Sequence, residues 1–169
     1  MSDGTVRPCR ESDLEAVAAI YSHYVLSSTV TFELESPGLD YWRDRWRELT
    51  EAGLPFLVAE LDGRVVGYAC CSRWRPRPGY RFSLEDSVYL EPGIGRRGFG
   101  TLLLTALVER CRSLGFRELI GIMALPGAEA SVALHRKLGF VEVGRLIAVG
   151  FKFGRWLDTV VMQLHLARD

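Results

Sequence analysis

Hydrophobic positions near the start of the chain recur at helical spacing. A capping box at residues 12–15, followed by apolar residues every three or four positions, predicts a helix that runs to about Leu26. Residues 27–36 are loop-like with some strand character, and residues 39–52 predict a second helix that ends at Gly53. The pattern therefore predicts two helices before the first hairpin.

The middle of the chain carries patterns typical of strands. Two β-rich runs, residues 56–61 and 65–70, flank Asp62-Gly63, which predicts an antiparallel hairpin with a tight turn. A Pro-rich loop at residues 73–80 then leads to another strand at residues 82–90.

The second half contains one β-loop-α-β unit. Apolar side chains on one side of residues 101–114 predict a helix that begins near Gly98 or Phe99 and stops at Gly115. The remaining predicted elements are a strand at 118–123, a short helix at 130–138, and strands at 140–143, 147–151 and 159–166. This order predicts an α+β fold with antiparallel hairpins before and after the unit, in a single domain that covers residues 1–169.

The composition is that of an ordinary globular protein, with 48% hydrophobic and 25% charged residues. Lys+Arg and Asp+Glu both total 21, so bulk charge indicates neither a nucleic-acid nor a membrane partner. No apolar run approaches the roughly 18 residues that span a bilayer, and the N-terminus lacks a signal-peptide core, so we expect a cytoplasmic protein. The four cysteines and three histidines show no metal-ligand spacing, so no metal site is expected.

The glycine-rich segment GIGRRGFG, residues 93–100, suits a loop that holds phosphate. Its first six residues match the dinucleotide-binding fingerprint, but that fold requires repeated β-α units and here a hairpin precedes the loop. The alternative uses Gly98 and Gly100, which let the amides at the start of a helix approach a diphosphate, with Arg96 and Arg97 adding positive charge. This second interpretation is favoured and suits a carrier such as coenzyme A.

A strand followed by R-R-G-F-G and an apolar helix resembles the acetyl-CoA loop of the GNAT acetyltransferases. Four further segments, HYVLSSTVTFE, LEDSVYL, LHRKLGF and GFKFGRWLD, together resemble the phosphinothricin and methionine sulfoximine N-acetyltransferases across nearly the whole chain. The resemblance implies a mixed, mostly antiparallel twisted sheet flanked by helices. Two positions depart from the pattern: Gly95 stands where Gln or Arg is usual, and Ala128 where Asn is frequent.

Acetyl transfer to an amine requires a base, because an α-amine with a pKa of about 8 is mostly protonated at pH 7. Glu85 matches the family's base, with Asp86 as its rival, and His135 is expected to donate to the leaving thiolate or to hydrogen-bond the cofactor. The cofactor-binding positions that the resemblance implies are Val88, Tyr89, Leu90, Arg96, Arg97, Gly98, Phe99, Gly100, Thr101 and Ser131. The substrate-binding positions are Phe32, Glu33, Arg75, Arg77, Tyr80, Asp86 and Ser87.

Arginines crowd the loop before Glu85, at positions 73, 75, 77 and 81. They are either solvated or matched to an anion, in which case Arg75 and Arg77 would clamp a carboxylate or phosphinate. Lys152, Trp156 and Asp158 are expected at a dimer edge or in the pocket wall.

These observations predict an acetyl-CoA-dependent N-acetyltransferase that acts by direct transfer on the α-amine of a small amino acid analogue. The analogue would carry an anionic or sulfone-like group, and the family resemblance implies a homodimer. Two alternatives remain: a protein or peptide N-acetyltransferase of the same fold, and a non-catalytic acyl-CoA-binding module.

Overall fold

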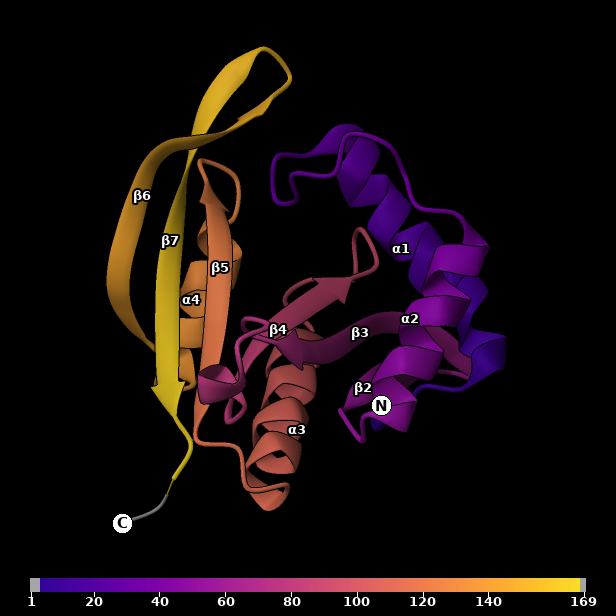
Figure 1. Cartoon of the computed structure of the whole chain (residues 1–169). Coiled ribbons are helices and arrows are strands. Elements are labelled where there is room, and N and C mark those ends of the chain that lie inside the picture. The colour runs from indigo at the N-terminus through magenta and orange to yellow at the C-terminus, as the bar shows by residue number, and fades with distance from the viewer. Residues whose placement is uncertain (1–3, 168–169) are drawn as a thin grey trace.

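The computed structural model describes residues 4–167 and contains one seven-stranded sheet with strand order β1-β2-β3-β4-β5-β7-β6 (Figure 1). The strands are β1 Thr5–Pro8, β2 Phe56–Leu61, β3 Arg64–Arg73, β4 Ser83–Leu90, β5 Glu118–Leu125, β6 Val141–Lys152 and β7 Arg155–His165. The helices are α1 Leu14–Ser27, α2 Leu39–Glu51, α3 Phe99–Ser113 and α4 Glu129–Lys137. All strand pairs are antiparallel except β4 with β5, so α3 forms the one parallel crossover among the described residues.

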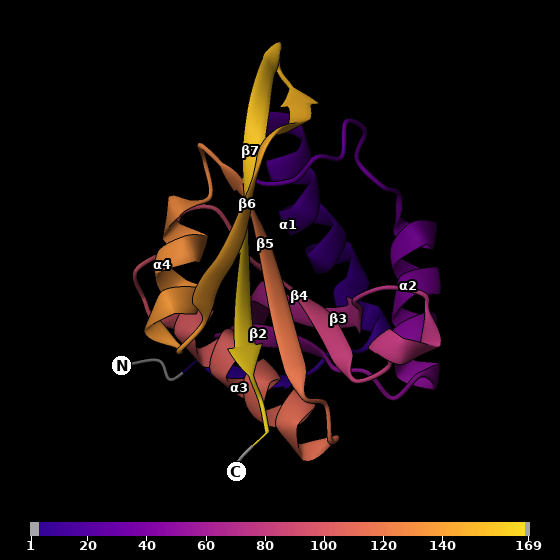
Figure 2. The ribbon, with the colours of Figure 1, turned by 60° about the vertical axis from the view of Figure 1, so that its left-hand side comes forward.

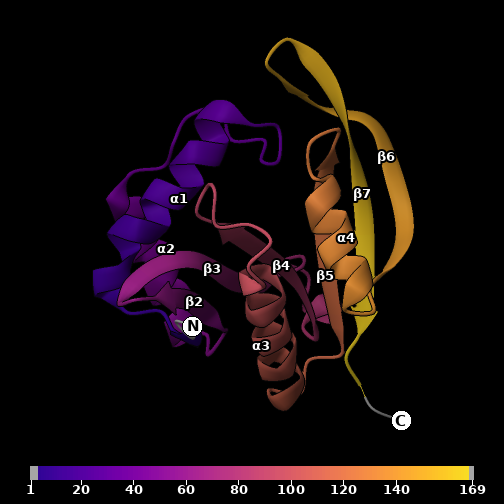
Figure 3. The same ribbon diagram turned by 180° about the vertical axis from the view of Figure 1, so that it is seen from behind.

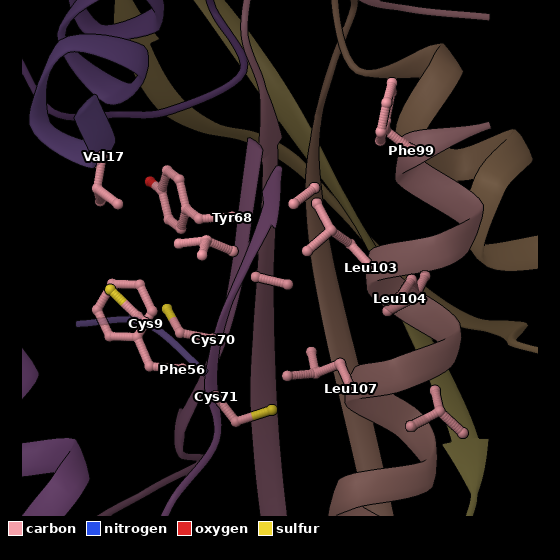
Figure 4. Close-up of a cluster of buried hydrophobic side chains, with 14 of the residues drawn as sticks. Cys9, Val17, Phe56, Tyr68, Cys70, Cys71, Phe99, Leu103, Leu104 and Leu107 are labelled. Atoms are coloured by element: carbon pink, nitrogen blue, oxygen red, sulfur yellow. The ribbon is translucent and has the colours of Figure 1, made fainter. Parts of the chain in front are cut away.

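Helices cover both faces of the sheet. Helices α1 and α2 lie on one face, while α3 and α4 lie on the other, which is turned to the viewer in Figure 3. Figure 4 shows the strands between these layers: Tyr68 and Cys70 point toward α1, whereas Cys71 points toward α3. Leu103, Leu104 and Leu107 on α3 are fully buried against the sheet, as their helical spacing predicts. No helix within residues 4–167 is both long and apolar enough to cross a membrane.

The sheet opens between β4 and β5. Their parallel pairing covers only Ser83↔Glu118, Leu84↔Leu119 and Glu85↔Ile120, after which the two strands diverge (Figures 1 and 2). The rest of β4, from Asp86 to Leu90, remains paired with β3 on its other side. This divergence leaves one edge of β4 available inside the fold, which positions the site described below.

Local turn chemistry explains the first hairpin. Asp62 and Gly63 both have positive φ, 51° and 76°, which is the backbone that a two-residue type I′ turn requires. The predicted hairpin is therefore confirmed, with β3 extending to Arg73 beyond the predicted end.

The predicted capping box was wrong. Residues 11–13 form a short 3₁₀ turn before α1, and the side chain of Asp13 accepts a hydrogen bond from the backbone N–H of Arg10 at 2.8 Å. Asp13 is also held by the Arg7 guanidinium at 2.7 and 2.9 Å. The ion pair with Arg7 thus accompanies a cap at Arg10, two residues before the N-cap that the sequence pattern indicates.

The predicted strands at residues 140–143 and 147–151 are a single strand, β6, with an irregular register between Leu146 and Gly150. Asp158 on β7 holds this irregularity: its Oδ1 accepts the N–H of Ala148 at 2.8 Å, and its Oδ2 binds Arg145 at 2.7 Å. Ala148 has a positive φ of 50°, so a cross-strand carboxylate fixes a bulge that hydrophobic periodicity reads as a break. Residues 28–36 contain no strand, contrary to the partial strand character of this segment.

Candidate active site

A cavity of about 730 Å³ occupies the opening between β4 and β5. It extends from Tyr21 of α1 and Phe32 in the following loop to His135 on α4, on the other side of the sheet. The predicted site residues that line it are Phe32, Glu85, Asp86, Ser87, Val88, Tyr89, Leu90, Arg96, Gly98, Gly100, Thr101, Ser131 and His135. The structure thus brings residues of α1, the loop after it, β4, the glycine loop and α4 to one cavity.

The start of α3 forms one end of the cavity. Gly98 has a φ of 87°, a left-handed conformation that favours glycine, and α3 begins at the next residue. A Cβ at Gly100 would lie 3.2 Å from Leu134 of α4, so glycine allows close helix contact there. Because the first amides of a helix have no intrahelical partner, this end can bind a diphosphate, and Arg96 adds charge to it.

Two other residues that were predicted to bind the phosphates, Phe99 and Arg97, do not line the cavity. Phe99 is only 5% exposed, packs into the core and is not among the residues that line the cavity. Arg97 is exposed and lies outside the cavity lining. Lys137, which the sequence did not identify, lines the cavity with its Nζ 3.3 Å from Oγ1 of Thr101. Its contact depends on how α4 packs against α3, and no local motif signals that.

The open edge of β4 presents peptide groups to the cavity. The N–H of Glu91 donates to the carbonyl of Val66 on β3 at 2.8 Å. Because peptide groups alternate in direction along a strand, those of Leu90 and Val88 point the other way, toward the opening. Consistent with this alternation, the Leu90 carbonyl accepts a hydrogen bond of 2.7 Å from the Tyr24 hydroxyl of α1. The strand can therefore pair with an extended ligand at Val88.

Two adjacent carboxylates lie on opposite faces of the sheet. Glu85 is opposite Ser72 and Asp86 is opposite Cys71 in the β3–β4 register. Cys71 faces α3, where its Sγ lies 3.4 Å from that of Cys111, so Asp86 also faces the α3 and α4 side. Glu85 consequently faces the α1 and α2 side. Strand alternation thus places one carboxylate on each side of the same opening.

Asp86 and His135 form a buried pair. Nε2 of His135 lies 2.9 Å from Oδ1 of Asp86, and the two side chains are 2% and 3% exposed. Nδ1 of His135 donates to the backbone carbonyl of Ser131 at 2.7 Å, since a carbonyl oxygen can only accept. Burial lowers the pKa of His135, but the hydrogen bond and charge of Asp86 outweigh it, and the pKa is raised.

This geometry bears on the predicted roles of His135. Both ring nitrogens are engaged, so neither N–H is directed at a leaving thiolate. Oδ2 of Asp86 is buried and has no hydrogen-bond partner among the described residues. The arrangement favours a role in which His135 holds Asp86 in place and keeps its own ring protons engaged. It does not favour the predicted donation of a proton to the thiolate.

Glu85 has the environment of a proton acceptor. Burial raises the pKa of its carboxyl, and the charge of Asp86 raises it further, while the charges of Arg45 and Arg75 oppose both effects. The net shift is upward, which increases the affinity of the carboxylate for a proton from an ammonium group. Arg45 reaches this region from α2, with Nη2 4.0 Å from Sγ of Cys70, and sequence motifs did not identify it.

The loop after α1 closes the Glu85 side of the cavity. The Tyr21 hydroxyl lies 2.7 Å from Oγ1 of Thr31, and Phe32 is 38% exposed beside them. Lys152 is buried and donates from Nζ to the Thr31 carbonyl at 2.9 Å. Lys152, which was predicted at a dimer edge or in the pocket wall, therefore lies behind this loop. Trp156, by contrast, is 66% exposed.

Several predicted substrate-binding residues do not line this cavity: Glu33, Arg75, Arg77 and Tyr80. Arg75 is exposed, with its guanidinium carbon 5.0 Å from the centre of the Trp74 ring, and it lines a separate groove beside Leu49 of α2. Tyr80 belongs to a 3₁₀ turn and is 42% exposed. The structure therefore leaves the predicted anion clamp at the surface, within electrostatic range of Glu85 but outside the cavity.

A divided sheet, a glycine-led helix at its opening and a carboxylate within it define the acetyltransferase fold that the sequence motifs predict. The model of the acetyltransferase (GNAT) family matches residues 17–140, and the chain belongs to this family. A phosphinothricin N-acetyltransferase from Alcaligenes faecalis is 48% identical over 162 residues, which are 96% of this chain and 82% of that protein. An L-methionine sulfoximine/L-methionine sulfone acetyltransferase from Pseudomonas aeruginosa is 39% identical over 164 residues, covering 96% of this chain and 94% of that protein.

A solved structure extends the comparison to the cofactor. A GNAT phosphinothricin acetyltransferase from Sinorhizobium meliloti, in complex with acetyl-CoA, has a TM-score of 0.92 and 42% identity, covering 98% of this chain and 89% of that one. The predicted α+β fold, a mixed sheet flanked by helices, is thereby confirmed as the GNAT fold. Gly95 and Ala128, where this chain departs from the family pattern, both line the cavity.

Proposed function

We propose that this protein uses acetyl-CoA to acetylate the α-amine of a small amino acid analogue of the phosphinothricin or methionine sulfoximine type. The observation that carries the proposal is the cavity itself, which joins the start of α3 to Glu85 through the opening in the sheet. The names and similarity of the relatives support the substrate class. We also propose that residues 1–169 form a single domain, as the sequence predicts.

The residues at the cofactor end fit acetyl-CoA. The amides from Gly98 to Thr101, with Arg96 and Lys137, would hold its diphosphate. The peptide groups of Val88 and the N–H of Leu90 would pair with the pantetheine arm as an added strand does. When bound, acetyl-CoA supplies the activated acetyl thioester.

Glu85 acts on the acceptor side. Its carboxylate takes the proton of the acceptor ammonium, either directly or through water, and leaves a neutral amine. Asp86 and His135 stay on the cofactor side, where their hydrogen bonds fix β4 to α4 at the opening. No side chain is required as a nucleophile, which agrees with direct transfer.

Arg75 and Arg77 are still predicted to clamp the anionic group of the acceptor. A cytoplasmic location of the protein also remains a prediction.

We further infer a homodimer through β6, the edge strand of the sheet. Most apolar side chains of β6 are exposed to solvent, including Ile147 at 71%. On the neighbouring strand β7, Trp156 is 66% exposed. An exposed apolar edge of this kind favours pairing with a second copy. Light scattering of the purified protein tests this: a mass near that of one chain at micromolar concentration would contradict it.

A thiol-release assay tests the function. Purified protein is incubated with acetyl-CoA and, separately, phosphinothricin, methionine sulfoximine, methionine sulfone, ordinary amino acids and short peptides. Turnover concentrated on the first three acceptors is expected. Turnover only on peptides would favour the protein N-acetyltransferase alternative, and acetyl-CoA binding without any turnover would favour the non-catalytic module.

A further inference from the structure

Strand β6 turns two residues toward the loop that closes the cavity. Gly150 and Lys152 are buried, whereas Val149, Phe151 and Phe153 alternate with them and are exposed. Gly150 is opposite Leu157 of β7, at the end of the bulge that Asp158 holds. The inward side of this strand is therefore occupied by the closing loop rather than by solvent.

Phe32 lies directly against the backbone of Gly150. A Cβ added at Gly150 would stand 2.3, 2.4 and 2.8 Å from the Cζ, Cε2 and Cε1 atoms of the Phe32 ring. These distances are well inside ordinary van der Waals contact, so the ring would have to move. The backbone of Gly150 does not have the left-handed φ that disfavours side chains, so the close contact with the Phe32 ring, rather than backbone strain, favours glycine here.

The loop that carries Phe32 is fixed at neighbouring positions. The Thr31 carbonyl accepts from Lys152 at 2.9 Å, and the Thr31 hydroxyl is 2.7 Å from that of Tyr21. Two residues earlier, Oγ1 of Thr29 donates to the Pro126 carbonyl at 2.8 Å. Because these bonds tie the loop to β6, to α1 and to the segment after β5, a side chain at position 150 would displace the ring more readily than the loop.

We propose that Gly150 is a specificity-determining residue, which sets the depth of the acceptor end of the cavity by allowing the Phe32 ring to rest on the β6 backbone. The inference rests on the acceptor assignment made above. Phe32 lines the cavity on one side and contacts Gly150 on the other, so a ring pushed off β6 moves toward the acceptor. The acceptors with the longest side chains would then lose the most catalytic efficiency, measured as kcat/KM.

The test compares two acceptors that differ by one methylene, methionine sulfone and S-methylcysteine sulfone. Gly150→Ala is expected to lower the ratio of kcat/KM for the longer to that for the shorter acceptor by about tenfold, the scale of one overpacked contact. KM for acetyl-CoA is expected to stay within about twofold, because the cofactor end is not touched. Gly144→Ala on the same strand is the matched control, since its added Cβ meets no atom within 4 Å.

A double variant tests whether the effect passes through the ring. In a Phe32→Ala background, adding Gly150→Ala is expected to leave the acceptor ratio unchanged. The proposal is overturned if Gly150→Ala leaves the ratio of the wild type intact, if Gly144→Ala shifts it equally, or if the shift persists without the ring. If Gly150→Ala does not fold, Phe32→Ala alone decides: the ratio must move toward the longer acceptor. Wild-type protein that acetylates neither acceptor nor phosphinothricin would instead overturn the proposed function.

Discussion

The buried pair of Asp86 and His135 makes a quantitative prediction about stability. His135→Leu removes one member and leaves the Asp86 carboxylate buried without a partner, since its Oδ2 already has none among the described residues. Breaking a buried pair in this way costs about 3–5 kcal/mol. For a chain of this size, that corresponds to a fall in Tm of about 6–20 °C.

The loss depends on pH in a defined direction. The folded protein raises the pKa of His135, so the pair contributes its full stability below the unfolded-state pKa of about 6.5 and loses it as pH rises through the folded value. The difference in unfolding free energy between the wild type and His135→Leu is therefore larger at pH 6 than at pH 9. Urea unfolding at both values measures it.

Two further variants complete the experiment. His23→Gln changes an exposed histidine of α1 and is expected to alter stability by less than about 0.5 kcal/mol at either pH. Adding Asp86→Asn to His135→Leu removes the unpaired charge and is expected to recover part of the loss. A loss below about 1 kcal/mol, or one of equal size at pH 6 and pH 9, would refute this account of the pair.

Three other predictions concern the site and the edge of the sheet. Glu85→Gln is expected to lower kcat by about 10²–10⁴-fold and to leave the affinity for acetyl-CoA, measured by calorimetry, unchanged. Wild-type activity is expected to fall as pH falls through the raised pKa of Glu85, and the variant should lack this pH dependence. Retained turnover would exclude Glu85 as the base. Gly98→Ala places a side chain at a φ of 87° and is expected to weaken acetyl-CoA binding about fivefold or more by calorimetry, whereas unchanged affinity would contradict the role of this turn. Ile147→Asp, at a side chain 71% exposed on β6, is expected to yield folded monomers by light scattering; a persistent dimer would exclude this edge as the interface.

Sequence patterns predicted the elements well where the signal is local. The turn at Asp62-Gly63 and the start of α3 after Gly98 follow from backbone preferences of one or two residues. The patterns failed where a specific polar contact decides the backbone conformation, as when Arg7 binds Asp13 at the cap or Asp158 holds the β6 bulge. Hydrophobic periodicity contains no information about such polar contacts.

The same distinction separates the two ends of the candidate site. Most of the cofactor end is built from β4, the following glycine loop and the start of α3, which are consecutive in sequence, so one motif could predict these parts but not Lys137 of α4. The acceptor end is built from residues as distant as Phe32 and Gly150, whose contact depends on how the loop after α1 meets the last hairpin. Because a change at either position alters the cavity without touching the glycine motif, relatives that share the cofactor end need not share an acceptor.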